Sequence, residues 1–219
     1  MLMLITIKQI LAGENLTRVA KEVAGLVFTS GKSTAGAAAK AVKDNQQASG
    51  PEAQSLLDFV RRALDAHTLF QAAAQIMHYG PMLISRYQTG MSYGLHVDNA
   101  FMSGVRADLS FTLFLSDANS YDGGALALEQ PAGRQSIKLD AGDLVLYPST
   151  SLHEVEPVTR GERVAVVGWV QSRVLHAEAR EALFDIAQVR ASLSTNLSVD
   201  PIVRLTLQKA EANLIRLLS

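Results

Sequence analysis

The sequence contains no cysteine among its 219 residues. Disulfide bonds, zinc sites built from thiolates and cysteine nucleophiles are therefore all excluded. Any metal ion must be held by nitrogen and oxygen ligands, which histidine, aspartate and glutamate supply. The candidate metal ligands of this chain are therefore its histidines and acidic residues.

The sequence also lacks a strong charge of either sign, because its formal net charge is −1 at pH 7. A nucleic-acid partner is not expected, since such binding needs a basic field. No apolar run approaches the roughly 20 residues that cross a bilayer, so no membrane association is expected. The apolar start, Met1 to Ile7, lacks a basic leader and is interpreted as a strand. These features predict a cytoplasmic protein.

The sequence also lacks a nucleotide-binding loop. Gly31-Lys32-Ser33 resembles the end of a phosphate loop, but that motif requires a glycine at the position of Leu26 and a strand before it. The nearest earlier glycine, Gly25, is one position too far away, and the preceding segment has helical spacing. We therefore exclude nucleotide binding.

The hydrophobic pattern predicts an α+β protein. Helical spacing covers residues 14–28, and a second helix begins near Pro51 and runs to about Gln75, after a polar segment at 43–47. Turn residues then separate seven short strands, at 83–87, 93–96, 109–115, 125–128, 136–139, 143–147 and 163–170. Many short strands at this spacing favour a sandwich or jelly roll.

We expect one domain over residues 1–175, with a strand and helices in 1–80 and the jelly-roll core in 82–173. Residues 176–219 are expected to form a helical extension packed on the same unit. The apolar stripe of its last helix could pack on the sheet or on another subunit, so a homodimer is an open alternative.

Four polar side chains indicate the chemistry. On a strand, residues i and i+2 project from one face, so His96 and Asp98 can reach the same point. His153, from a distant strand, would complete a set of two histidines and one carboxylate. This set leaves coordination positions open and is associated with non-haem Fe(II) oxygenases. Arg163 offers a fixed, charged fork for a carboxylate-bearing co-substrate.

Several segments resemble a known family. They are Arg86-Tyr87-Gln88, Tyr93 to Asp98, Leu113 to Ser116, Ser120 to Gly124, Ala141 to Pro148, Leu152-His153 and Thr159 to Arg163. Together they are similar to the PKHD-type hydroxylases, bacterial relatives of the prolyl hydroxylases among the Fe(II)/2-oxoglutarate dioxygenases. The similarity runs through nearly the whole chain and is strongest between residues 83 and 173. The connection from Asn99 to Val105 looks shorter than is usual in this family, which bears on substrate preference.

The resemblance implies a double-stranded β-helix, a cupin-like jelly roll with flanking N- and C-terminal helices. It implies iron on His96, Asp98 and His153, 2-oxoglutarate on Arg163, and ascorbate as reductant. Reaction with O2 would hydroxylate a peptidyl residue or a small molecule and release succinate and CO2.

Further residues are predicted around this centre. A phenol beside a guanidinium can donate a second hydrogen bond to the distal carboxylate of 2-oxoglutarate, so Tyr87 and Tyr147 are candidates for co-substrate binding. Asn45, Gln47 and Asn99 are candidates for substrate contacts. Trp169 is expected in the core.

Two alternatives remain open at this stage. One is a cupin-like metal enzyme that uses no 2-oxoglutarate, which would leave Arg163 unexplained. The other is a non-catalytic jelly-roll module, in which the metal-binding set is structural.

Overall fold

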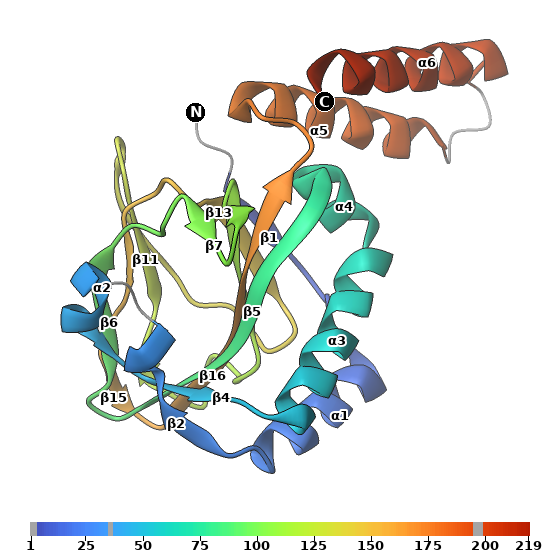
Figure 1. Cartoon of the computed structure of the whole chain (residues 1–219). Coiled ribbons are helices and arrows are strands. Elements are labelled where there is room, and N and C mark those ends of the chain that lie inside the picture. Colours follow the sequence, from blue (N-terminus) through green and yellow to red (C-terminus); the bar gives the residue numbers. More distant parts are fainter. Residues whose placement is uncertain (1–3, 35–36, 195–198) are drawn as a thin grey trace.

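Two antiparallel sheets face each other at the centre of the molecule, as a computed structural model describing residues 4–34, 37–194 and 199–219 shows (Figure 1). The larger sheet has the strand order β1-β13-β9-β16-β5-β4-β2, and the smaller has the order β12-β11-β14-β6-β3. Phe114 and Val145 of the larger sheet pack with Leu126 and Leu128 of the smaller one in a shared core cluster. The expected jelly-roll sandwich is therefore what the chain forms.

The strands of the larger sheet are β1 (Ile5–Ile7), β2 (Phe28–Ser30), β4 (Gln46–Ala48), β5 (Ile76–Gln88), β9 (Leu109–Phe114), β13 (Leu144–Pro148) and β16 (Glu162–Ser172). Those of the smaller sheet are β3 (Lys43–Asp44), β6 (Ser92–His96), β11 (Leu126–Gln130), β12 (Gly133–Ile137) and β14 (His153–Val155). Two-residue and three-residue strands form separate pairs: β7 (Phe101–Met102) with β8 (Val105–Arg106), and β10 (Asp122–Gly123) with β15 (Val158–Arg160).

Helices cover the outer face of the larger sheet (Figure 1). They are α1 (Gly13–Ala24), α3 (Pro51–Ala66) and α4 (Thr68–Ala74), while the short η1 (Gly31–Thr34) and α2 (Ala37–Val42) lie between β2 and β3. Side chains at alternate positions of β9 and β16, such as Leu113 and Val166, pack against α3 and α4 in the main core cluster. Phe111 of β9 contacts Phe70 of α4 edge to face. The opposite face of these strands is free to line a site.

The expected long helix after Pro51 is interrupted. Pro51 begins α3, as predicted, but His67 adopts an extended conformation, and its ring accepts a hydrogen bond from the backbone N–H of Phe70. His67 therefore ends α3 and caps α4. The first helix also ends at Ala24 instead of Phe28, because Phe28 begins β2. Residues 1–3 of the expected first strand lie outside the described residues.

Residues 43–47 were expected to be a polar connecting segment, but the chain from Lys43 to Ala48 forms the strands β3 and β4, which join the two sheets. Lys43 pairs with Tyr93 of β6 in the smaller sheet. Gln46 to Ala48 then pair with residues 84–86 of β5 in the larger sheet. The chain thus crosses between the sheets at this edge and forms a wall of the space between them.

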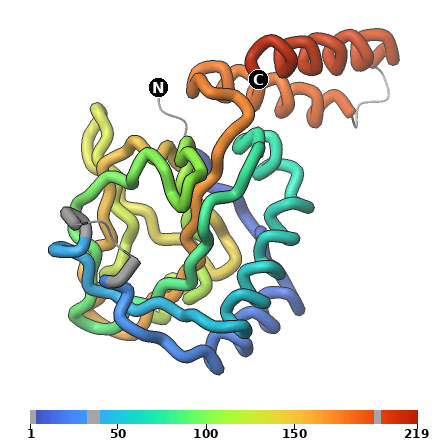
Figure 2. The backbone as a smooth tube through the Cα atoms, viewed as in Figure 1, coloured from blue at the N-terminus to red at the C-terminus, as the bar shows by residue number. Residues whose placement is uncertain are grey.

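A helical hairpin follows the sandwich and projects from one end of it (Figure 2). It consists of α5 (Ala177–Ser194) and α6 (Pro201–Leu218), joined by an ion pair between Arg190 and Glu211 at 2.7 Å. Leu183 and Ala187 of α5 are buried, and α5 contacts α4. Asp200 caps α6 and Pro201 occupies its first turn. Within the described ranges, no helix is both long and apolar enough to cross a membrane.

Candidate metal centre and co-substrate pocket

One pocket between the two sheets collects every residue predicted to form the site. Its lining includes His96, Asp98, His153, Arg163, Tyr87, Tyr147, Asn45, Gln47 and Asn99. The first eight lie in or beside the strands that frame the pocket, and Asn99 is exposed just beyond Asp98. The sandwich therefore brings together side chains that are up to 118 positions apart, from Asn45 to Arg163.

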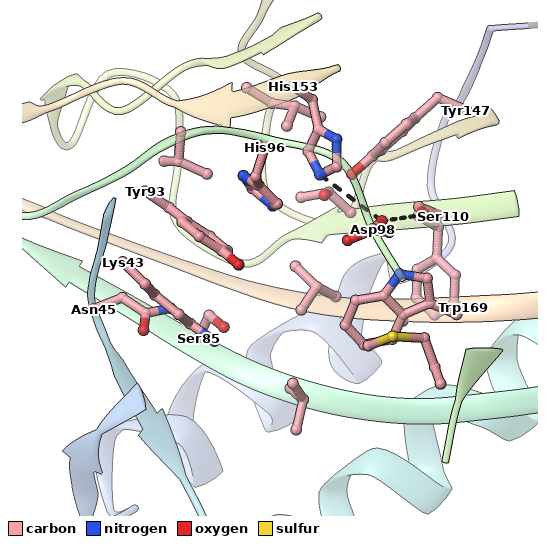
Figure 3. Close-up of a pocket in the computed structure, with 18 of the residues that line it drawn as sticks. Lys43, Asn45, Ser85, Tyr93, His96, Asp98, Ser110, Tyr147, His153 and Trp169 are labelled. Atoms are coloured by element: carbon pink, nitrogen blue, oxygen red, sulfur yellow. Dashed lines mark hydrogen bonds and ion pairs between the residues drawn. The ribbon is translucent and has the colours of Figure 1, made fainter. Parts of the chain in front are cut away.

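The two histidines are direct cross-strand neighbours. His153 of β14 pairs with His96 of β6, and their ring centroids are 4.3 Å apart. Asp98 follows β6, and its Oδ2 lies 3.8 Å from Nε2 of His153 (Figure 3). One ligand atom from each of these three residues lies within 4.8 Å of the others. Such a cluster can surround one metal ion.

The imidazole tautomers suit metal binding. Nδ1 of His96 lies 2.8 Å from the carbonyl oxygen of Gly94, and Nδ1 of His153 lies 2.9 Å from that of Ser151. A carbonyl can only accept, so Nδ1 carries the proton in each neutral ring and Nε2 is left with its lone pair. Burial, and secondarily the neighbouring His153, lowers the pKa of His96 to about 4, which favours the neutral form that a metal requires.

The carboxylate of Asp98 is held by a hydroxyl. Ser110 Oγ donates to Asp98 Oδ2 at 2.6 Å (Figure 3). The same Oγ lies 2.7 Å from Ser149 Oγ in a second hydrogen bond. Both serines are buried. Fixing Oδ2 leaves the other oxygen of Asp98 to turn towards a metal ion.

Arg163 is a buried cation. Its side chain is 1% exposed, and none of its three side-chain nitrogens has a hydrogen-bond partner among the described residues. The guanidinium lies over the rings of Tyr87 and Phe114, at 5.3 and 5.2 Å from their centroids. Arg163 forms no surface ion pair with its sequence neighbours Glu154, Glu156 and Glu162. Glu154 and Glu156 bind Arg134 instead, and Glu162 pairs with Arg86. An unneutralised guanidinium at this depth fits a ligand with a carboxylate.

The two tyrosines predicted to bind the co-substrate line the same pocket. Tyr87 of β5 is the cross-strand partner of Arg163, and its hydroxyl oxygen accepts a hydrogen bond from Nδ2 of Asn45 at 3.2 Å. The Tyr87 proton therefore remains available for another acceptor. Tyr147 packs edge-on against His153, with centroids 5.2 Å apart. Burial raises the pKa of both phenols, so both stay protonated hydrogen-bond donors.

The pocket lining also includes residues that were not predicted for the site, among them Ser110, Lys43, Tyr93 and Trp169. Ser110 was missed, Lys43 and Tyr93 were not considered for the site, and Trp169 was expected in the core. Trp169 is 9% exposed and does line the pocket, on the same face of β16 as Arg163. Side chains alternate between the two faces of a strand, so Trp169 lies on the same face of β16 as Arg163. In the same way, Ser110 lies on the face of β9 opposite to Leu109 and Leu113. This alternation could have placed both residues on the inner face from the sequence alone.

Two other sequence features, Gln46 and a Gly-x-Ser-x-Gly motif, do not contribute to the site. Gln46, which lies between the substrate candidates Asn45 and Gln47, does not line the pocket and accepts two hydrogen bonds from Arg86. Gly90-Met91-Ser92-Tyr93-Gly94 fits the Gly-x-Ser-x-Gly pattern of nucleophile elbows, which requires a strand-to-helix turn. Here the segment is a turn that enters β6, so no elbow is formed.

Comparison with known proteins identifies the family. The model of the 2OG-Fe(II) oxygenase superfamily matches residues 82–171. The PKHD-type hydroxylase of Maricaulis maris (strain MCS10) is 46% identical over 98% of both chains. The chain belongs to the PKHD-type hydroxylases. A second such hydroxylase, from Picosynechococcus sp., is 45% identical over 99% of this chain and 100% of its own.

Solved structures agree with this PKHD-type fold. A prolyl-4-hydroxylase from Pseudomonas putida aligns with a TM-score of 0.53 at 19% identity, covering 77% of this chain and 92% of its own. A prolyl hydroxylase from Trichoplax adhaerens, solved with a peptide fragment, aligns with a TM-score of 0.56 at 18% identity, covering 82% and 86%. This PKHD-type chain is therefore an Fe(II)- and 2-oxoglutarate-dependent dioxygenase. Membership of the family argues against both alternatives, the cupin-like metal enzyme that uses no 2-oxoglutarate and the non-catalytic jelly-roll module.

Proposed function

We propose that His96, Asp98 and His153 bind Fe(II) and that Arg163 binds the distal carboxylate of 2-oxoglutarate in a hydroxylation reaction. The observation that carries the proposal is the buried guanidinium of Arg163, which no described carboxylate neutralises, in the same pocket as the three metal-ligand candidates. A dicarboxylate co-substrate bound to the metal at one end would satisfy this guanidinium at the other.

The metal and co-substrate, when bound, would supply the oxidising chemistry, in which O2, 2-oxoglutarate and a substrate C–H bond yield succinate, CO2 and the alcohol, with one oxygen atom going to succinate and one to the alcohol. The protein binds and orients the reactants. Arg163 offers a bidentate fork, while Tyr87 offers the proton that its hydrogen bond from Asn45 leaves available. Tyr147 is the second phenol assigned to the co-substrate. Ser110 holds the carboxylate of Asp98 in place.

The substrate would approach from the side of the pocket that these groups leave open. Asn45 and Gln47 lie in the wall formed by residues 43–48, and Asn99 lies at the exposed end of the metal-binding segment. We assign all three to the substrate side, with Asn45 acting through Tyr87. The substrate is a peptidyl residue or a small molecule with an oxidisable C–H bond.

The deciding experiment is an anaerobic titration of the Fe(II)-loaded protein with 2-oxoglutarate, recording the visible charge-transfer band of the chelate. The wild-type protein should develop the band, and Arg163→Met should require about 10- to 100-fold more 2-oxoglutarate, since a charge-assisted hydrogen-bonding group is lost. Arg61→Met, at an exposed position of α3, is the matched control. A titration of Arg163→Met that matches the wild type would refute the assignment, and iron binding without a band would return the cupin-like alternatives.

Ascorbate belongs to the same proposal, as the reductant that keeps the iron ferrous during repeated turnover. Its support is the family membership alone. Turnover that continues undiminished without any reductant would count against this role. Because the reaction needs bound Fe(II) and consumes 2-oxoglutarate supplied by metabolism, we also assign the protein to the cytoplasm, which cell fractionation with a specific antibody would test.

We further propose that the protein is a homodimer formed through the C-terminal hairpin. On α6 the only buried residue among those described is Glu211, while Ile202, Leu205 and Leu217 are 60%, 60% and 79% exposed. The sheet does not cover these side chains, so the second arrangement considered for this helix, contact with another subunit, is the one that the exposure favours.

A further inference from the structure

The pocket wall formed by residues 43–48 presents side chains at alternate positions. Lys43, Asn45 and Gln47 are 5%, 3% and 6% exposed, and all three line the pocket. Asp44, between the first two, is exposed. A strand places residues i, i+2 and i+4 on one face, so this crossing segment aims one ammonium group and two amides at the space beside the metal site. Asn45 already positions Tyr87. Lys43 has no part in iron or 2-oxoglutarate binding as proposed above.

The ring of Tyr93 lies between Lys43 and the metal-ligand candidate His96. The Lys43 ammonium lies 5.2 Å from the ring centroid of Tyr93, which itself stacks on His96 at 3.7 Å with an angle of 16° between the planes. Arg163 extends from β16 in the opposite sheet. Figure 3 shows Lys43 and Tyr93 on one side of the site and Trp169 on the other. A molecule between them would have its reacting carbon near the metal and one end near Lys43.

The charges of the pocket favour an anion at that end. Its charged lining residues, apart from the two histidines, are Lys43, Asp98 and Arg163, which together carry one net positive charge. A ferrous ion and a 2-oxoglutarate dianion cancel each other when both are bound. The loaded pocket would therefore retain one positive charge in a largely buried setting, where an opposite charge on the incoming substrate is favourable.

We propose that Lys43 is a specificity-determining residue that binds a carboxylate of the substrate. The substrate class is thus a carboxylate-bearing molecule, such as an amino acid, an amino-acid derivative or the C-terminus of a peptide, hydroxylated at a carbon close to that carboxylate. This inference rests on the proposed function, because it requires iron and 2-oxoglutarate to occupy the positions given above.

Binding of a ligand in this pocket can be measured without an added label. The chain contains a single tryptophan, Trp169, which lines the same pocket, so ligand binding can be followed by intrinsic fluorescence. The probes are N-acetyl amino acids and the corresponding N-acetyl amino-acid amides, which differ only in the carboxylate. They are titrated anaerobically into the protein loaded with Fe(II) and 2-oxoglutarate, after the charge-transfer band of each sample has been recorded.

We expect at least one acid to bind to the wild-type protein more tightly than its amide. Lys43→Met should weaken binding of that acid about 10- to 100-fold and leave the amide unchanged, because only the charge-assisted contact is lost. Lys43→Arg should restore most of the preference for the acid. Lys21→Met, at an exposed position of α1, should behave like the wild type.

Three results would overturn the inference. They are equal binding of acid and amide in the wild type, an unchanged preference in Lys43→Met, and no binding of any acid at millimolar concentration. A Lys43→Met protein whose charge-transfer band is lost, as in Arg163→Met, would also overturn it by placing Lys43 in the 2-oxoglutarate site. Failure of the proposed function looks different, because the wild-type protein itself would then form no band.

Discussion

At the scale of single residues, the site depends on which hydrogen-bonding groups are already occupied. The Nδ1 atoms of His96 and His153 are bound to backbone carbonyls, and one oxygen of Asp98 is bound to Ser110. What remains is Nε2 of each imidazole and the other carboxylate oxygen. One ligand atom from each of the three residues lies within 4.8 Å of the others. These hydrogen-bonding partners orient the candidate ligands before a metal binds, so removing one of them should lower the affinity for the metal.

Ser110→Ala tests this orientation. The substitution removes the hydroxyl that donates to Asp98 and leaves the carboxylate free to rotate, so Fe(II) affinity should fall about 10- to 100-fold. Isothermal titration under anaerobic conditions measures the affinity directly. Ser136→Ala, which removes an exposed hydroxyl bound to Glu156, is the control and should leave the affinity unchanged. Equal affinities for both variants and the wild type would mean that Asp98 is positioned by other contacts.

The titration of Lys43 should make the stability of the folded protein depend on pH. Burial lowers the pKa of Lys43 from 10.5 to about 8, an effect that the charge of Asp98 only partly opposes. Between these pH values the unfolded chain binds more protons than the folded one, so the free energy of unfolding rises with pH. The gain should be about 1 kcal/mol after allowance for solvent screening.

Urea denaturation from pH 7.5 to 10 measures this effect as the difference between the wild type and Lys43→Met. The difference isolates Lys43 from the other groups that titrate in the range. The stability of Lys43→Met relative to the wild type should be greatest near pH 7.5 and should shrink as the pH rises. A constant difference would show that the pKa of Lys43 is not lowered in the folded protein.

At the scale of elements, one face of each central strand serves the core and the other serves the site. On β16, Val164, Val166 and Val170 pack in the main core cluster, whereas Arg163 and Trp169 line the pocket. Gly168 is the close-packed exception on the core side, because a Cβ there would lie 2.5 Å from Cζ of Phe111. The strand can carry functional groups on one face only because the other is anchored to the helices.

Gly168→Ala should therefore be destabilising. The added methyl would push Phe111 against Phe70 of α4, and we expect a loss of about 1–3 kcal/mol in the free energy of unfolding. Gly25→Ala is the control, since a Cβ there meets its nearest atom at an ordinary 3.5 Å and the backbone has a φ of −89°. Urea denaturation compares the two. Equal stabilities would indicate that Phe111 moves aside without cost.

At the scale of the whole molecule, the hairpin of α5 and α6 stands apart from the sandwich that holds the site. It is tied to the body through α4 and through Arg180, whose Nη1 donates to the carbonyls of Val174 and Leu175. Its exposed apolar side chains have no role in the proposed chemistry. Association with a second copy would remove them from water without covering the pocket.

Leu205→Glu tests the homodimer. Light scattering after size-exclusion chromatography should give twice the chain mass for the wild type and the mass of one chain for the variant, because a buried carboxylate opposes association. Val27→Glu changes an equally apolar residue that is 74% exposed near α1, and it should remain dimeric. A wild-type protein that is monomeric at micromolar concentration would contradict the proposal.

The sequence by itself determined the kind of chemistry and the architecture. The absence of cysteine restricts the metal ligands, the spacing of His96 and Asp98 places both on one side of an extended segment, and alternation with frequent turns gives an antiparallel sandwich. The nine predicted site residues all line one pocket. Their roles as iron, co-substrate and substrate ligands stay predictions until the variants are measured, and so does the division at residue 175.

Only the tertiary structure decided which polar residues complete the pocket. The segment at 43–47 has the composition of a solvated turn, and pairing with β5 and β6 makes it a buried wall. His67 divides the long helix because its ring caps the next one. Ser110 becomes a partner of Asp98 through a contact between residues 12 positions apart. Local pattern predicts which elements form, but burial and long-range pairing depend on how the sheets close, and that is a property of the whole chain.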